Sequence, residues 1–559
     1  MTTQTATIDT KHPSGLWVLF GTEMWERFNF YGMRALLSLF LVNALSMQEA
    51  EVAIIYGGFL GLCYLTPLLG GYIADNYLGN RACIMLGGLI MAMGQFFLFW
   101  SASTFGSSVS SATTIMYVAL GLIILGNGFF KPNISSMVGS LYPRERKGML
   151  DSAFTIFYMG INLGALLGQF LCPLLGDVKN GDIRDNTAFK WGFLAAGIAM
   201  VLGTIIFYIF KDKHIVSPDG QPIGTGPKGG HSKIYEEGES QKAIFTNKSM
   251  VMSLLAVVAL FSLFHFVMEQ NVVYSIIYSA GATLAGFILT DTTLTKVERD
   301  RILVIYIVAF FVIFFWAAFE QAGSSLTFIA DNQTDRHIFG WEMPPSMVQI
   351  FNGLFVVIFA APFSYLWLRL NKKGKEPISP VKQAIGLALI ALGYLVIATQ
   401  VKDIGAVGKI GIIWLIVLYL LHTFGELCLS PIGLSLVAKL SPQRFSSLLM
   451  GVWFISNACA YALSGTLGAL LPPTGDKYVA AEKLGINLQQ VLDGTTQLTT
   501  AQLSTLHEAK IAAVYPQIAG ITIHNLYEFF MMFVVLCGVA AVLLMAITPA
   551  LKKMMHGIR

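Results

Sequence analysis

The sequence predicts an all-α protein that crosses a lipid bilayer many times, built from two six-helix bundles and an inserted two-helix hairpin. Of its 559 residues, 55% are hydrophobic and only 12% are charged, whereas a soluble domain carries roughly 25% charged residues. The apolar residues gather in stretches of about 20, the length that an α-helix needs to cross the hydrocarbon core. Alternation with a period of two, which would indicate a membrane barrel, is missing from these stretches. These observations exclude a soluble enzyme, a disulfide scaffold and a disordered protein.

Fourteen apolar stretches are the predicted transmembrane helices. Their ranges are 15–46, 52–74, 82–104, 113–137, 152–175, 191–210, 249–268, 271–290, 302–329, 346–368, 383–401, 411–437, 445–471 and 525–549. Six precede a polar segment and six close the chain, so the two between them form a hairpin, an arrangement that suits a secondary transporter. The predicted units are a first bundle at 1–210, a flexible linker at 211–248, the hairpin at 249–300, and a second bundle at 301–559 with a long outward loop at 472–524.

The distribution of basic residues predicts which side of the membrane each loop faces. With the N-terminus inside and fourteen spans, 24 of the 36 Lys and Arg residues fall in cytoplasmic loops and 9 in loops on the opposite side. Arg27, Arg34 and Lys131 lie within the spans. Because cytoplasmic loops are enriched in Lys and Arg, we expect both termini in the cytoplasm. The net charge is only +4 and the basic residues are spread along the chain, which predicts no nucleic-acid partner.

Seven charged residues lie at deep positions of the predicted spans, where each charge needs a partner or a water-filled cavity. They are Glu23, Glu26, Arg27, Arg34, Lys131, Glu320 and Glu426. In the first span, Glu23, Arg27 and Arg34 fall close to one helical stripe together with Tyr31. Static ion pairs between helices are one explanation, but the many Gly and Ala residues already provide tight helix packing. We expect instead carboxylates that release their cation partners when they bind a proton, as in a proton-coupled carrier.

Fixed charges of both signs suit a zwitterionic solute. Arg34 and Lys131 can bind a carboxylate, and Glu426 can bind an ammonium group. Polar and aromatic residues of the same spans are candidates for lining a pocket between these charges: Tyr31, Tyr64, Tyr158, Asn162, Trp316, Asn352, Trp453 and Asn457. Each of these side chains, taken alone, is also compatible with ordinary helix packing or with an interfacial belt.

Motifs of other mechanisms are missing from the sequence. There is no Gly-x-x-x-x-Gly-Lys followed by Ser or Thr that would bind ATP, and no His-Glu-x-x-His that would bind zinc. The six cysteines have no paired spacing. We therefore expect no enzyme, no metal and no cofactor, with protons as the co-substrate. We also expect a chain that functions as a monomer in the bilayer without an obligate protein partner.

Residues 23–32, which read EMWERFNFYG, resemble the ExxERFxYYG motif of the proton-dependent oligopeptide transporter family, a branch of the major facilitator superfamily. Further segments agree with that family along most of the chain. They are 70–75, 130–133, 154–166, 315–321, 425–427, 430–431 and 451–454. The resemblance implies the major facilitator fold and proton-coupled symport of di- and tripeptides into the cell by alternating access.

The resemblance also implies roles for the charged residues. Glu23, Glu26 and Arg27 would act with Lys131 and Glu320 in proton coupling. The pair formed by Glu320 and Arg34 would close the outer gate, and Lys131 and Glu426 would also take part in gating. The inserted hairpin is typical of bacterial members, so the resemblance implies a bacterial inner membrane.

The peptide itself would be bound at both ends. By the resemblance, Glu426 would contact the peptide amino terminus, and Arg34 and Lys131 its carboxylate. Asn162 and Asn352 would contact its backbone or a terminus. Tyr31, Tyr64, Tyr158, Trp316, Trp453 and Asn457 remain candidate pocket residues.

Two residues depart from the family pattern. Phe30 stands where the motif usually has tyrosine, which is expected to remove one hydroxyl from the pocket. Asn76 follows Asp75 where many relatives have arginine, which is expected to weaken a charge pair at the inner gate. Other solutes remain an alternative cargo, namely nitrate, an amino acid or a peptide-like drug. A sensor that binds its ligand without moving it is a further alternative.

Overall fold

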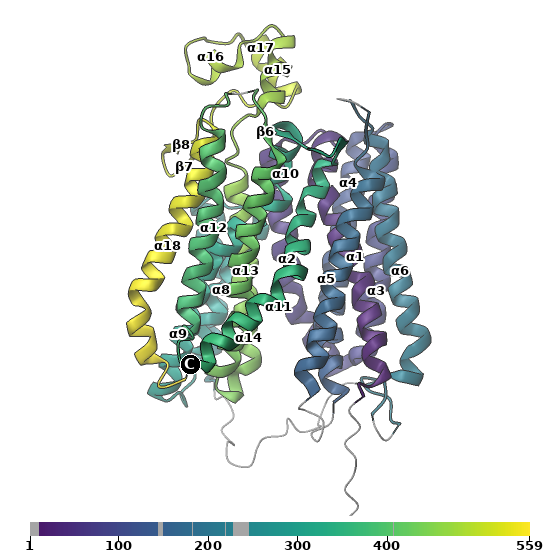
Figure 1. The fold of residues 1–559 in the computed structure, drawn as a ribbon, viewed down its shortest axis with the longest axis vertical. Helices are drawn as coiled ribbons and strands as arrows, with labels where there is room; N and C mark the ends of the chain where they lie inside the picture. Colours follow the sequence, from purple (N-terminus) through teal and green to yellow (C-terminus); the bar gives the residue numbers. More distant parts are fainter. Residues whose placement is uncertain are drawn as a thin grey trace, which may run out of the picture.

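The computed structural model describes residues 11–142, 149–180, 183–217, 220–226, 245–405 and 407–558. Long helices run along a common direction and form two groups, one from each half of the chain (Figure 1). Short helices and strands lie at the end drawn uppermost in that view. The predicted all-α architecture is confirmed by this arrangement.

The first half consists of six long helices. They are α1 (Ser14–Asn43), α2 (Glu49–Ile73) with the π-helical turn η1 (Ala74–Leu78), α3 (Asn80–Thr104), α4 (Val109–Ser140), α5 (Leu150–Gly176) and α6 (Phe189–His214). A small antiparallel hairpin of β1 (Lys179–Asn180) and β2 (Ile183–Arg184), followed by η3 (Asn186–Ala188), connects α5 to α6. Helix α1 packs against α5 and α6, and α3 packs against α4. Glycines permit close crossings, because a Cβ added at Gly70 of α2 would lie 1.9 Å from the Gly128 carbonyl oxygen of α4.

The inserted hairpin comes next in the chain and lies against both halves. It consists of α7 (Asn247–Ser262) with the π-helical turn η4 (Leu263–Val267), and of α8 (Val272–Ile288). Helix α7 packs on α8 and buries none of its own residues, whereas α8 also packs on α14 and α2. The hairpin therefore reaches the rest of the molecule through α8.

The second half contains the remaining long helices and several short segments at their ends. In chain order these are α9 (Lys296–Phe319), η5 (Glu320–Gly323), α10 (Ser325–Asn332), β3 (Thr334–Asp335), β4 (His337–Ile338), β5 (Trp341–Glu342), η6 (Pro345–Gln349), α11 (Ile350–Lys372), α12 (Ser379–Val401), β6 (Ile410–Gly411), α13 (Ile412–Leu440), η7 (Gln443–Phe445), α14 (Ser446–Gly468), α15 (Gly475–Lys483), α16 (Leu488–Leu492), α17 (Thr500–Glu508), β7 (Gln517–Ile518), β8 (Ile521–Thr522) and α18 (Leu526–Met554). Strands β4 and β5, like β7 and β8, pair antiparallel, and β3 pairs with β6 in parallel. Helix α12 packs against α13 and α18.

Twelve helices among the described residues are long and apolar enough to cross a membrane. Helix α1 is not one of them, because it carries Glu23, Glu26, Arg27 and Arg34. Helix α8 has only 17 residues. The count of fourteen crossings and the cytoplasmic position of both termini therefore stay predictions.

The first part of the predicted linker is structured, which differs from the expected flexible chain. Helix α6 extends to His214, and the residues after it turn back onto the start of α3. Arg81 holds them there, since its guanidinium donates to the carbonyls of Ile215 (2.5 Å) and Ile223 (2.6 Å) and pairs with Asp212 (2.6 Å). Polar composition alone does not reveal such an anchor. The rest of the predicted linker, at 227–244, lies outside the described residues.

The predicted outward loop folds into a small cap. Its three short helices, α15, α16 and α17, enclose a hydrophobic cluster of their own that is separate from the main core. The cap lies at the upper end of the molecule in Figure 1. Lys477 of α15 lies 3.7 Å from the Glu49 carboxylate at the start of α2, so an ion pair connects the cap to the first half.

Candidate functional site

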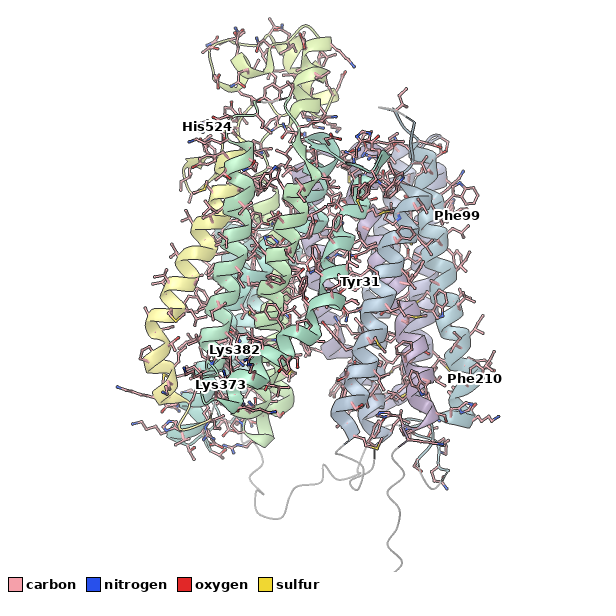
Figure 2. The ribbon with its side chains drawn as sticks, in the orientation of Figure 1. Tyr31, Phe99, Phe210, Lys373, Lys382 and His524 are labelled. Carbon is pink, nitrogen blue, oxygen red and sulfur yellow. The ribbon has the colours of Figure 1, made fainter. Side chains whose placement is uncertain are left out.

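The predicted site residues lie on helices that border the seam between the two halves. Contacts across this seam join α2 to α14, α5 to α11, and α1 to η5 and η6. Tyr31 of α1 lies about midway along the molecule (Figure 2). Three groups of charged and polar side chains occupy this region, and each is built from elements distant in the sequence.

The first group lies on α1 and is buried. Arg27 Nε lies 2.8 Å from Glu23 Oε1 and 2.6 Å from Glu26 Oε2. Glu23 and Arg27 share a helix face because they are four residues apart. Two carboxylates face one guanidinium here, and Glu26 is 0% exposed. Since a buried charge is costly unless it is paired, the second carboxylate of this group needs either a further cation or a proton.

Lys131 of α4 lies close to the first group. Its Nζ is 3.7 Å from the centroid of the Tyr64 ring on α2, which is a cation–π contact. Electrostatic interaction also couples Lys131 to Glu26. Tyr64 in turn contacts Tyr461 of α14, with 4.7 Å between ring centroids. A cation of the first half is therefore linked through two tyrosines to the second half.

The second group joins the halves directly. Arg34 Nη2 of α1 lies 2.7 Å from Glu320 Oε2, where α9 ends and η5 begins. The Arg34 guanidinium carbon also lies 5.4 Å from the Tyr31 ring centroid and 5.9 Å from that of Tyr56. Arg34 is 8% exposed and Glu320 is 3% exposed, so this ion pair is shielded from solvent. The predicted pair is present and joins the two halves at this level.

The backbone of η5 approaches the first half closely beside this ion pair. Ser38 Oγ of α1 donates to the Gly323 carbonyl oxygen at 2.5 Å. A Cβ added at Gly323 would lie 1.7 Å from the Tyr56 hydroxyl, so only glycine fits here. The end of α9 is thereby fixed against α1 and α2.

The third group lies in the second half and surrounds Glu426 of α13. Asn352 Nδ2 of α11 donates to Glu426 Oε2 at 2.9 Å and to Thr423 Oγ1 at 3.1 Å. Tyr158 of α5, in the opposite half, lies within electrostatic range of the Glu426 carboxylate. Tyr158 is exposed, and its backbone carbonyl accepts a hydrogen bond from Asn162 Nδ2 at 2.8 Å. The predicted ammonium-binding carboxylate and one predicted amide thus form a unit.

The remaining predicted pocket residues have different surroundings. Trp453 is buried, and a Cβ added at Gly433 would lie 2.2 Å from its ring, so it packs α14 against α13. Trp316 is half-buried and packs on Phe319, with 5.2 Å between ring centroids. Asn457 is buried, and its Oδ1 has no hydrogen-bond partner among the described residues. Their roles in binding stay predictions.

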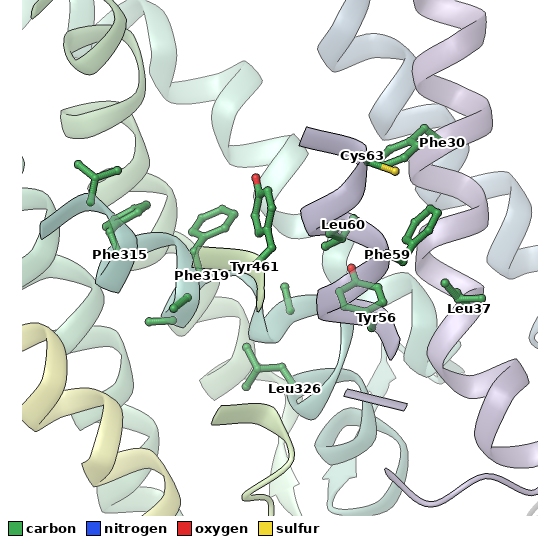
Figure 3. Close-up of a cluster of buried hydrophobic side chains, with 14 of the residues drawn as sticks. Phe30, Leu37, Tyr56, Phe59, Leu60, Cys63, Phe315, Phe319, Leu326 and Tyr461 are labelled. Carbon is green, nitrogen blue, oxygen red and sulfur yellow. The ribbon is translucent and has the colours of Figure 1, made fainter. Parts of the chain in front are cut away.

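Two tyrosines of the seam were not among the predicted site residues. Tyr56 contacts Arg34, and Tyr461 contacts Tyr64. Figure 3 shows Tyr56, Leu60 and Tyr461 within one hydrophobic cluster. Tyr56 and Tyr64 are eight residues apart, or about 80° around α2, so both belong to one broad helix face, a spacing that could have identified Tyr56 from the sequence.

Phe30 lies between helices beside the first group, and the Arg27 guanidinium carbon is 6.0 Å from its ring centroid. Its ring stacks on Phe59 of α2 with 6.1 Å between centroids, and it is 4% exposed. Figure 3 shows both rings beside Cys63. The side chain thus fills the interface of α1 and α2, and the effect of the missing hydroxyl on the pocket stays a prediction.

A further ion network joins the halves at their upper end. Asp331 of α10 pairs with Lys179 (2.5 Å) and Arg184 (2.7 Å) of the β1–β2 hairpin. Arg184 Nε also lies 3.0 Å from Asp177 Oδ1. The other carboxylate oxygen of Asp177, Oδ2, accepts a hydrogen bond from the Ser346 backbone N–H at 3.0 Å. Burial disfavours the charged guanidinium, but the two carboxylates outweigh it and raise the pKa of Arg184. No sequence pattern pointed to this network, because charged residues in loops are common.

Comparison with known proteins places these features in context. The model of the POT family matches residues 81–477. The peptide transporter YePEPT of Yersinia enterocolitica is 33% identical, and the match covers 82% of this chain and 88% of that protein. Dipeptide and tripeptide permease B of Salmonella typhimurium is 31% identical, with coverage of 81% and 86%. A crystal structure of a POT family transporter with a thioalcohol-conjugated peptide is 26% identical, covers 97% of each chain and has a TM-score of 0.72.

Proposed function

Because this chain belongs to the POT family, we propose that it is a proton-coupled symporter that carries di- and tripeptides into the cell by alternating access. The relatives named above are a peptide transporter and a dipeptide and tripeptide permease. The structural match extends over nearly the whole chain. These similarities support the transport of short peptides over the other solutes considered from the sequence.

One observation carries the proposal, namely that fixed charges of both signs meet at the seam between two helical bundles. Arg34 and Glu320 pair across the seam at 2.7 Å, and Lys131 and Glu426 lie on opposite halves. A short peptide is a zwitterion with its charges a few bonds apart. Lys131 and Arg34 would bind its carboxylate, and Glu426 would bind its ammonium group.

Proton coupling would follow from competition for the same cations. A proton on Glu320 removes the charge that holds Arg34, which opens the seam and frees the guanidinium for the peptide carboxylate. A proton on Glu23 or Glu26 acts in the same way on Arg27, which now has two carboxylate partners. Each pH unit across the membrane supplies about 1.4 kcal/mol per proton, and a potential of about 100 mV supplies roughly 2.3 kcal/mol more. No metal or organic cofactor enters this scheme.

The chain is a multi-pass membrane protein, and we propose that it resides in the bacterial inner membrane with both termini in the cytoplasm. The excess of Lys and Arg in the loops assigned to the inside supports this orientation. The proposed charge groups can bind both ends of a short peptide within a single chain, so we include function as a monomer in the proposal. No further protein partner is needed by the proposed mechanism.

The decisive experiment is uptake of labelled dialanine into proteoliposomes under an inwardly directed proton gradient. We expect accumulation above equilibrium that collapses when a protonophore is added. Unlabelled peptides of two and three residues should compete strongly, whereas a tetrapeptide, free alanine and nitrate should not. If nitrate or free alanine competes and the peptides do not, the chain carries that solute and the proposal of peptide transport is wrong. Binding of dialanine without counterflow would identify a sensor and contradict transport.

A further inference from the structure

The inserted hairpin touches the crossing of two helices that belong to different halves. Helix α8 packs against α14 of the second half and against α2 of the first half. Asn271 caps the start of α8 by accepting a hydrogen bond from the Tyr274 backbone N–H at 2.9 Å. Tyr274 therefore sits in the first turn of α8, at the end where α2 begins.

The Tyr274 side chain is inserted into this crossing. It is 1% exposed, and its hydroxyl donates to the Ile54 carbonyl oxygen of α2 at 3.0 Å. A Cβ added at Gly57 of α2 would lie 2.8 Å from that hydroxyl, and one at Gly465 of α14 would lie 2.0 Å from it. Two glycines on facing helices thus leave space for a single phenol group.

A second contact of α8 lies one turn further along. Ile277 is fully buried, and a Cβ added at Gly61 of α2 would lie 2.6 Å from its Cδ1. The Cys459 thiol of α14 donates to the Ile277 carbonyl oxygen at 3.9 Å. Tyr274 and Ile277 form one buried cluster with Ala458 and Ala462 of α14. The hairpin therefore fills the groove between α2 and α14 along two turns.

We propose that Tyr274 is a positioning residue through which the inserted hairpin holds α2 against α14 and so stabilises the closed outer seam. The inference rests on the alternating access proposed above. Opening of the outer end must separate α2 from α14, and this movement breaks the bond from Tyr274 to Ile54 or exposes the buried phenol. The hairpin thereby sets the equilibrium between the two conformations of the carrier, in addition to the ion pair of Arg34 and Glu320.

The test measures the separation of the halves directly. Spin labels are attached to p-acetylphenylalanine placed at Ser110 of α4 and at Asp403 after α12, which are exposed positions on different halves. This labelling leaves the six native cysteines in place. Distances are measured by pulsed electron resonance in nanodiscs for the wild type and for Tyr274→Phe, which removes only the hydroxyl. We expect the population with the longer distance to rise about fivefold, which corresponds to about 1 kcal/mol, the net contribution of one hydrogen bond.

A matched control comes from a tyrosine that binds α8 without crossing the seam. Tyr306 of α9 donates its hydroxyl to the Ala285 carbonyl oxygen at 2.9 Å, and Tyr306→Phe should leave the distances unchanged. For peptide supplied from outside, Tyr274→Phe should lower KM more than it changes kcat, because more carriers face outward. Unchanged distances in Tyr274→Phe, or the same shift in both variants, would overturn the inference. Failure of wild-type uptake would refute the proposed function, while the distances would still report on Tyr274.

Discussion

At the scale of single residues, each of the seven deep charges contacts a partner of opposite sign, an amide or an aromatic ring. Hydropathy and helix periodicity identified these residues from the sequence, because a charge is rare in such a segment. Their partners were harder to predict. The bond of Asn352 to Glu426 joins α11 to α13, and the contact of Lys131 with Tyr64 joins α4 to α2. Such pairings depend on how helices distant in the sequence are arranged.

Glu320 is predicted to couple the proton to the outer gate. The variant Glu320→Gln keeps the shape of the side chain but removes its charge, so Arg34 is no longer bound in a proton-dependent way. We expect proton-driven accumulation of dialanine to fall at least about tenfold in proteoliposomes, while counterflow persists. The control is Glu342→Gln, which should cost little because Glu342 is exposed and the buried Arg336 keeps its hydrogen bonds to the carbonyl oxygens of Met343 and Ala330. Full accumulation by Glu320→Gln would show that the proton is coupled elsewhere.

Glu426 is predicted to select the free amino terminus of the peptide. In Glu426→Gln, we expect the KM for dialanine to rise about tenfold to a hundredfold, which corresponds to the roughly 1.5–3 kcal/mol of a hydrogen bond to a charged group. N-acetyl-dialanine should then compete about as well as dialanine, in contrast to the wild type. Competition assays of labelled uptake measure both quantities. Glu528→Gln, at the start of α18, serves as the control, and retained discrimination in Glu426→Gln would assign the ammonium group to another residue.

At the scale of elements, most helices could be predicted because each needs a long apolar stretch of its own. The elements that could not be predicted depend on distant contacts. The turn after α6 is fixed by Arg81 of α3, and the cap of α15, α16 and α17 is fixed by a small core assembled from separate short helices. Neither the Arg81 anchor nor the small core of the cap can be recognised from the local amino-acid composition. The helix crossings could not be predicted either, because a glycine is required there only by the close approach of a helix that is distant in the sequence.

The crossing of α2 and α4 gives a prediction about stability. In Gly70→Ala, the new Cβ would lie 1.9 Å from the Gly128 carbonyl oxygen, and a backbone atom cannot move aside alone. We expect a loss of about 1–3 kcal/mol, the usual cost of overpacking, measured as a lower midpoint of thermal unfolding in detergent. Gly71→Ala is the matched control, since its Cβ would first meet Pro132 at 3.8 Å. Equal midpoints for the two variants would contradict this close crossing.

At the scale of the whole molecule, several contacts hold the halves together towards the end where the cap lies. The ion pair of Arg34 with Glu320, the network around Asp331 and the bond of Tyr274 to Ile54 all cross the seam. The two-bundle organisation was expected from the order of the apolar stretches. The conformation, with the halves in contact at the outer end, could not be predicted, because the same sequence must support both the inward-facing and the outward-facing state of a carrier.

The network around Asp331 is predicted to restrain opening of the outer end. Asp331→Asn leaves Lys179 and Arg184 without their shared carboxylate, and breaking a buried pair is strongly destabilising for the state that contains it. With the label positions Ser110 and Asp403, we expect the longer-distance population to rise about tenfold. Asp335→Asn is the control, because Asp335 is exposed and bonds to His337 of its own loop. An unchanged distance distribution in Asp331→Asn would remove this network from the gate.

The hydrogen bond from Asn352 to Glu426 has a consequence for the return half of the cycle. The amide of Asn352 gives the Glu426 carboxylate a hydrogen-bond donor from the same chain. If Glu426 binds an ammonium group, as proposed, that group must compete with this amide, and the amide can donate to the carboxylate again once the solute is released. The exchange of donors would lower the cost of leaving a buried carboxylate without a ligand during the return of the empty carrier.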